Sequence, residues 1–238
     1  MTIVITMAGM GSRFKKAGYK VPKYMIVSKG RSLFEWSMLS LEGFKSEENK
    51  YFFVVRKADD SSCFIKNECE KLAIKNFEII EIDSLTDGQA TTAMLVSEKW
   101  NKNSALLIYN IDTYVEENEM NTTQIEGDGF IPCFYGEGTH WSFVKTDESN
   151  KAIEIREKDK ISDNCTLGAY YFKSCLLYEN LYNEYYSSEE NMEKGEKYVA
   201  PLYNYLISKG GEVKISIVDK KKVHVLGTPE ELNIFEQQ

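Results

Sequence analysis

Short apolar runs alternate along the first half of the chain with segments whose apolar residues recur at helical spacing. The runs predict strands at residues 2–7, 51–55, 77–82 and 105–109, and the spacing predicts helices at residues 33–44, 61–74 and 91–100. Alternation of strands and helices is typical of a largely parallel sheet with helices on both faces.

The pattern changes after about residue 125, where several predicted strands follow one another. We expect strands at residues 127–135, 142–146, 152–157, 168–172, 212–218 and 222–226, helices at 176–186 and 197–209, and an exposed polar loop at 187–196. The segment Gly227-Thr228-Pro229-Glu230-Glu231 has a Thr suited to an N-cap, a Pro at the first helical position and acids in the first turn. It predicts a terminal helix.

Length and composition fit one globular domain. The chain has 238 residues, 42% of them hydrophobic, and a single large domain accounts for that length. The net charge of −8 argues against a nucleic-acid binder held by a basic surface. The five cysteines include no C-x-x-C pair, which favours a reducing compartment. We also find no apolar run long enough for a signal peptide or for a membrane span, so we expect a cytoplasmic protein.

A glycine-rich loop after the first strand carries the clearest chemical signal. Gly9, Gly11 and Arg13 follow the strand directly, and Lys23 comes shortly after. Backbone N–H groups of such a loop can approach phosphate oxygens, which the two cations would neutralise. Phe14 takes the third glycine position of the dinucleotide fingerprint, and no Gly-Lys-Ser/Thr follows, so neither standard nucleotide motif is present. An ordinary tight turn with surface cations is the alternative.

Two further segments could complete a nucleotide site. Asp112 follows the apolar strand at residues 105–109, where an acid could hold Mg²⁺ against phosphates or simply cap a loop. Gly88 precedes a predicted helix, where it could admit a flat base or form an N-cap turn.

These residues resemble the sugar-1-phosphate nucleotidyltransferases, and the resemblance covers nearly the full length. It implies a single Rossmann-like (GT-A-type) three-layer α/β domain over residues 1–238 with a mixed, mostly parallel central sheet. Residues 1–125 would form the nucleotide-binding half and residues 126–238 the acceptor-binding half. Carried over to this sequence, the nucleotide-binding residues would be Ala8, Gly9, Gly11, Ser12, Arg13, Lys23, Gly88 and Gln89.

The resemblance also implies an acceptor site and a metal. Asp112 would bind Mg²⁺, and the acceptor would be held by Glu157, Lys158, Gly168 and Tyr170. The closing family motif, Asp-x-Gly-Thr-Pro, is similar to Val225-Leu226-Gly227-Thr228-Pro229, so Val stands where the family has a second metal-binding Asp. Either one carboxylate suffices, or another acid substitutes, or catalysis is lost.

The implied reaction transfers NMP from an NTP, with CTP or UTP favoured, to a sugar-1-phosphate or similar small phosphomonoester and releases pyrophosphate. Arg13, Lys23, Asp112 and Lys158 would be the catalytic residues. The motifs look closest to members from capsule and surface-polysaccharide clusters. A glycosyltransferase that uses Asp112, although position 110 is Asn, and a non-catalytic nucleotide sensor are the alternatives. The sequence leaves open whether the chain forms a homo-oligomer.

Overall fold

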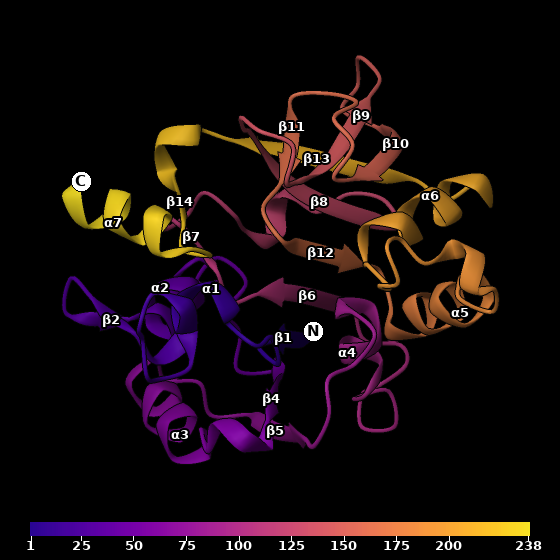
Figure 1. Ribbon diagram of the computed structural model, residues 1–238. Coiled ribbons are helices and arrows are strands. Elements are labelled where there is room, and N and C mark those ends of the chain that lie inside the picture. Colours follow the sequence, from indigo (N-terminus) through magenta and orange to yellow (C-terminus); the bar gives the residue numbers. More distant parts are fainter.

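The computed structural model describes residues 1–238 and has one large mixed sheet at its centre (Figure 1). The strand order is β10-β9-β11-β8-β12-β6-β1-β4-β5, with β13 paired to β8. The strands of this sheet are β1 (Thr2–Thr6), β4 (Lys50–Arg56), β5 (Phe77–Ile82), β6 (Leu106–Asn110), β8 (Gly129–Tyr135), β9 (Ser142–Thr146), β10 (Ala152–Glu157), β11 (Asn164–Thr166), β12 (Ala169–Phe172) and β13 (Val213–Val218).

Strands β6, β1, β4 and β5 pair in parallel, and antiparallel pairs dominate the second half, where β13 alone adds in parallel. The predicted α/β fold with a mixed central sheet is therefore confirmed. Two small antiparallel strand pairs lie outside the sheet, formed by β2 (Val27–Ser28) with β3 (Arg31–Ser32) and by β7 (Thr113–Val115) with β14 (Val223–Val225).

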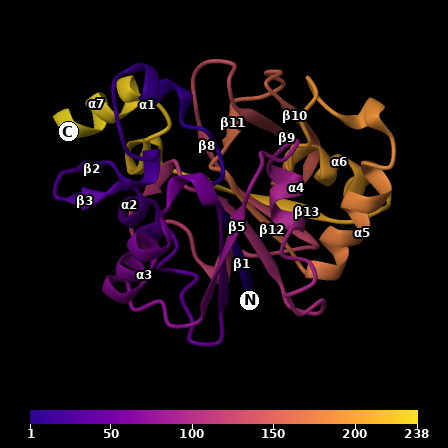
Figure 2. The ribbon, with the colours of Figure 1, turned by 60° about the horizontal axis from the view of Figure 1, so that its bottom comes forward.

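Helices cover both faces of the sheet. They are α1 (Ser12–Lys16), α2 (Leu33–Leu39), α3 (Ser62–Lys71), α4 (Gln89–Met94), α5 (Cys175–Tyr185), α6 (Ala200–Ser208) and α7 (Pro229–Gln237). Neighbouring residues of one strand point to opposite faces, so Ile3 and Ile5 of β1 pack with α2 and α3, whereas Val4 packs with the α4–α6 side. Figure 2 shows the two groups of helices on opposite sides of the strands.

A third, smaller core joins the two ends of the chain. Phe14 of α1 is packed with Leu226 and with Leu232 and Phe235 of α7. Helix α7 accordingly lies beside α1 in both ribbon views, although more than 200 residues separate them in sequence (Figures 1 and 2). Its start is as predicted, because the Thr228 side chain accepts a hydrogen bond from the Glu231 N–H and Pro229 is the first helical residue. This packing brings the end of the chain to the glycine-rich loop.

Three predicted helices have different bounds, for identifiable reasons. The helix predicted at 33–44 ends at Leu39, where the Ser40 side chain accepts the Val115 N–H. The helix predicted at 91–100 covers Gln89–Met94 and then gives way to tight turns. The helix predicted from residue 197 begins at Ala200, because the backbone of Lys197 pairs with the segment before α4. No helix of the structure is long and apolar enough to cross a membrane.

Candidate functional site

A cavity of about 750 Å³ lies at the carboxyl ends of β1 and β6, where open α/β sheets bind ligands. Its lining includes every residue that the sequence analysis selected: Ala8, Gly9, Gly11, Ser12, Arg13, Lys23, Gly88, Gln89, Asp112, Glu157, Lys158, Gly168 and Tyr170. The structure therefore brings together segments that span residues 8–170.

The glycine-rich loop leaves β1 and turns directly into α1. Gly11 is the N-cap of this short helix and has a φ of 59°, a left-handed conformation that glycine adopts without strain. A side chain at Gly11 would touch Cβ of Lys23, 3.6 Å away, so the loop passes close to the second cationic residue. Arg13, in the same helix, is exposed and lines the cavity.

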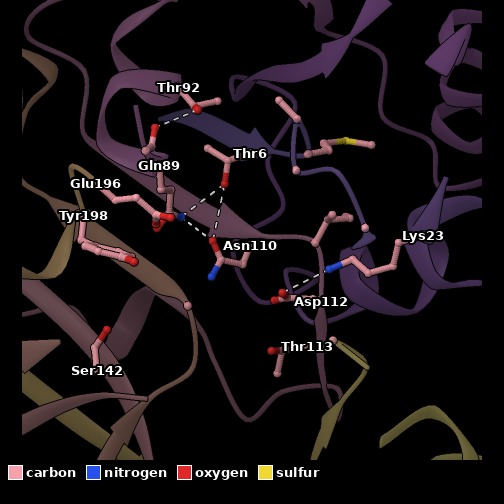
Figure 3. A pocket seen from close by; sticks show the side chains of 18 of the residues that line it. Thr6, Lys23, Gln89, Thr92, Asn110, Asp112, Thr113, Ser142, Glu196 and Tyr198 are labelled. Carbon is pink, nitrogen blue, oxygen red and sulfur yellow. Dashed lines mark hydrogen bonds and ion pairs between the residues drawn. The ribbon is translucent and has the colours of Figure 1, made fainter. Parts of the chain in front are cut away.

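Lys23 and Asp112 form an ion pair within the cavity (Figure 3). The Lys23 Nζ lies 3.1 Å from Asp112 Oδ2, and 18% and 37% of the two side chains are exposed. Asp112 follows β6 in a tight turn that the Leu226 N–H holds by donating to the Asp112 carbonyl, at 2.8 Å. The predicted phosphate-binding cation and the predicted metal ligand thus stand side by side.

Gly88 has a role in the fold that the sequence did not reveal. A Cβ on Gly88 would lie 2.3 Å from the carbonyl oxygen of Lys197, and its φ is 144°. Lys197 N–H donates to the Asp87 carbonyl and the Ala90 N–H donates to the Lys197 carbonyl, at 2.7 and 3.0 Å. The close approach at Gly88 is therefore made by the protein's own backbone, and Gly88 is also the N-cap of α4.

Gln89 points toward the ends of β1 and β6 (Figure 3). Its side-chain amide donates to the Thr6 hydroxyl, at 3.2 Å, and to Asn110 Oδ1. The Asn110 N–H donates to the Gly168 carbonyl at 3.0 Å, and the Asn110 side chain lies so close that a Cβ on Gly168 would be 2.7 Å from Asn110 Nδ2. A polar network therefore connects the start of α4, the central strands and the turn before β12.

The acceptor residues predicted from the resemblance gather around the end of β10. Glu157 accepts a hydrogen bond from the Ser142 hydroxyl, and its Oε1 lies 3.4 Å from Lys158 Nζ. Tyr170 is buried beneath them, where its hydroxyl lies 3.1 Å from that of Thr166. Burial raises the pKa of Tyr170 to about 12, so this phenol is neutral at physiological pH.

Sequence reasoning missed Tyr198, which contacts the proposed acceptor lysine. Lys158 Nζ donates to the Tyr198 hydroxyl at 2.7 Å and lies 4.5 Å from the centre of its ring. Burial opposes the charged ammonium, but the hydrogen bond to Tyr198 and the carboxylate of Glu157 together raise the pKa of Lys158 above its ordinary value. Lys158 also has a φ of 54°, which is uncommon for a residue with a side chain.

Tyr198 and Glu196 flank Lys197, whose backbone lies against Gly88. Figure 3 shows the two side chains together across the cavity from Lys23. We predicted residues 187–196 as an exposed loop. Most of these residues are exposed, but Glu196 lines the cavity. No local motif marks Glu196 or Tyr198; only the pairing of Lys197 with Asp87 and Ala90 brings them to the site.

The oxygen atoms near Asp112 suit a hard divalent cation such as Mg²⁺. Besides the Asp112 carboxylate, Glu231 lines the cavity, and its Oε2 atom is buried without a hydrogen-bond partner. Val225 also lines the cavity and offers no ligand. The structure contains no group of three or more His, Cys, Asp or Glu side chains that could hold a metal on their own. Mg²⁺ commonly binds with one or two carboxylates plus phosphates and water, so the donors present fit it.

Comparison with known proteins gives a consistent result at the level of structure. Neither the family models nor the curated proteins contain a match to this sequence. The nucleoside-diphosphate-sugar pyrophosphorylase from Vibrio cholerae RC9 is 36% identical, with 99% of this chain and 100% of that chain covered and a TM-score of 0.91.

Two more distant structures share the fold. The inositol-1-phosphate CTP transferase from T. maritima is 16% identical, with 99% and 93% of the two chains covered and a TM-score of 0.79. A candidate glucose-1-phosphate thymidylyltransferase from Bacillus anthracis, in complex with sucrose, is 15% identical, with 100% and 94% covered and a TM-score of 0.78. Identity above one third over essentially the whole of both chains shows that this chain belongs to the nucleoside-diphosphate-sugar pyrophosphorylase family of nucleotidyltransferases.

Proposed function

We propose that this protein transfers NMP from an NTP to a sugar-1-phosphate or similar small phosphomonoester and releases pyrophosphate. The observation that carries this proposal is one cavity lined by cationic side chains at two separate places. Arg13 and Lys23 come from the glycine-rich loop region, and Lys158 comes from the end of β10. A reaction that joins two phosphate-bearing substrates needs positive charge at two places in one cavity.

The acceptor phosphate would be its own nucleophile. The second pKa of a phosphomonoester is about 6, so the group is largely a dianion at neutral pH. An oxygen of this dianion attacks the α-phosphorus of the NTP, the bond to the β-phosphate oxygen breaks, and pyrophosphate leaves with that electron pair. No proton must be removed from the nucleophile, so this step needs no general base.

The side chains would act by position and charge. Lys23 and Arg13 neutralise the triphosphate and the leaving pyrophosphate, while Lys158 holds the acceptor phosphate for in-line attack. A triphosphate carries more negative charge than a carboxylate, so we expect it to draw the Lys23 ammonium from Asp112. Asp112 would then be free to hold Mg²⁺, which would supply positive charge to neutralise the phosphates when bound.

Further aspects of the proposal rest on the resemblance and on chemistry. We assign nucleotide binding to residues 1–125, with Ala8, Gly9, Gly11, Ser12, Gly88 and Gln89 beside the two cations, and acceptor binding to residues 126–238, with Glu157, Gly168 and Tyr170 beside Lys158. We favour CTP or UTP as the donor and a precursor of surface polysaccharide as the product. Five cysteines without a disulfide, four of them buried, support a reducing compartment such as the cytoplasm.

The experiment that tests this function is a pyrophosphate-release assay with Mg²⁺. CTP, UTP, GTP, ATP and dTTP are each combined with a panel of sugar-1-phosphates and other small phosphomonoesters. We expect release with one NTP and one acceptor, and none when either substrate is omitted. Binding of an NTP without release for any acceptor would contradict the transferase and favour a nucleotide sensor.

A further inference from the structure

Glu231 has a carboxylate oxygen that the fold leaves without a partner. The Oε2 atom is buried and makes no hydrogen bond, although a buried charged oxygen without a partner destabilises a folded protein. The backbone N–H of Glu231 is used, because it donates to the Thr228 hydroxyl at the start of α7. Thr228-x-x-Glu231 has the spacing of a capping box, yet no hydrogen bond from the Thr228 N–H to the Glu231 side chain accompanies that contact. Helix capping therefore does not account for this side chain.

The unpartnered oxygen lies beside Asp112. A single carbon added to Gly227 would lie 3.3 Å from Glu231 Oε2 and 3.7 Å from Asp112 Oδ2. The two carboxylates thus flank one small space, which the missing side chain of Gly227 leaves open. Both residues line the cavity, although Asp112 follows β6 and Glu231 lies near the end of the chain.

The surrounding fold fixes this pair in place. The Leu226 N–H donates to the Asp112 carbonyl, and Leu226, Leu232 and Phe14 share the small core that seats α7 against α1. Of the two carboxylates, only Asp112 forms an ion pair, with Lys23, which the proposed triphosphate would draw away. Two converging carboxylates would then remain close to the phosphates, where their mutual repulsion favours a bound divalent cation.

We propose that Glu231 is the second protein carboxylate of the metal site, acting on the cation directly or through one of its water ligands. This inference rests on the proposed function, since it takes Asp112 as the first carboxylate. It resolves the difficulty posed by Val225, whose side chain lines the same cavity and cannot bind Mg²⁺. Another acid, from the following helix, supplies the second negative charge.

Mn²⁺ binding measured by electron paramagnetic resonance tests the proposal without relying on turnover. The wild-type protein and the variants Glu231→Gln, Asp112→Asn and Glu230→Gln are titrated with Mn²⁺ and each of the five NTPs in turn. Glu230 is the matched control, because it is an exposed acid in the same first turn of α7. We expect Glu231→Gln to weaken protein-dependent Mn²⁺ binding about tenfold to hundredfold, Asp112→Asn to weaken it at least as much, and Glu230→Gln to leave it unchanged.

The outcomes separate this inference from the function on which it rests. If Asp112→Asn loses Mn²⁺ and Glu231→Gln binds it like Glu230→Gln, the inference fails and the Asp112 site stands. If the wild type binds no Mn²⁺ beyond that held by the nucleotide alone, both the proposed metal site at Asp112 and the inference about Glu231 fail.

Thermal unfolding midpoints measured without metal separate a role in metal binding from a purely structural role, because only a structural role of Glu231 would make Glu231→Gln less stable than its control. Glu231 is partly exposed but keeps one buried carboxylate oxygen without a hydrogen-bond partner, so removing its charge should leave Glu231→Gln at least as stable as Glu230→Gln. A clear loss of stability, confined to Glu231→Gln, would assign the side chain to the helix and overturn the proposal.

Discussion

The two sides of the cavity are constructed differently. The proposed phosphate side, which we define as residues 7–23 with Asp112, is dominated by one continuous stretch of chain that follows β1. The proposed acceptor side, defined as Ser142, Glu157, Lys158 and Tyr198, is assembled from β9, β10 and the segment before α6. A continuous stretch leaves a motif in the sequence, whereas a surface assembled from separate strands depends on packing that no single segment encodes.

Replacing Asp112 should cause the largest effect, because it removes the carboxylate that would hold the proposed metal ion. Asp112→Asn keeps the shape of the side chain, and we expect it to lower kcat about 10²-fold or more with the fold intact. Initial rates of pyrophosphate release and the unfolding midpoint measure the two parts. Asp83→Asn, at an exposed acid outside the cavity, is the control. Unchanged activity of Asp112→Asn with Mg²⁺ would remove Asp112 from the mechanism.

Two lysine variants test whether the two sides hold different substrates. Lys23→Ala should raise the KM for the NTP more than that for the acceptor, and Lys158→Ala should do the reverse. A hydrogen bond from a charged group contributes about 1.5–3 kcal/mol, which corresponds to roughly tenfold to hundredfold in the affected KM. Full initial-rate matrices in both substrates give the four constants. The opposite pattern for Lys158→Ala would reassign this lysine to the triphosphate.

The fold and the phosphate side were largely predictable because their signals are local. The apolar run before the glycines predicted β1, and the apolar run before Asp112 predicted β6 and placed this acid at its end. Thr228-Pro229 predicted the start of α7. Each of these depends on residues that are neighbours in sequence. Every site residue chosen from such signals and from the family resemblance lines the cavity.

The rest was not predictable because it depends on contacts between distant segments. Tyr198 lies in the cavity through the backbone pairing of Lys197 with the segment before α4, and the same pairing delays the start of α6 to Ala200. Glu231 read as an ordinary first-turn acid, and only the packing of α7 against α1 brings it close to Asp112. The sequence indicated that Gly88 admits a flat base or forms an N-cap turn, whereas the structure places the backbone of Lys197 against it.

Gly88→Ala should therefore disturb both sides of the cavity together. The new Cβ would lie 2.3 Å from the Lys197 carbonyl oxygen, so the two backbones must move apart. Gly210→Ala is the matched control, because Gly210 also has a positive φ, 83°, but open space around it. We expect Gly88→Ala to lose about 1–3 kcal/mol more free energy of unfolding than Gly210→Ala, measured by chemical denaturation. Its KM values for both substrates should rise. Equal stability of the two variants would mean that the 196–198 segment is not held by this contact.

The smallest expected effect is the response of the acceptor side to pH between 7 and 9. Lys158 has a raised pKa, so the folded protein favours the ammonium, and its stabilising contribution is present below the unfolded-state value of about 10.4. That contribution is lost only as the pH rises through the higher folded-state pKa. Tyr170, with a pKa of about 12, also stays neutral over this range. The acceptor phosphate titrates near pH 6, so kcat/KM for the acceptor should fall below pH 6 and change less than about twofold from pH 7 to 9.

Lys158→Ala should lower the whole profile without moving its acid limb, since that limb belongs to the substrate. A wild-type decline between pH 7 and 9 that Lys158→Ala abolishes would show that this lysine loses its proton there, and the contacts with Tyr198 and Glu157 would then not hold it in its charged form.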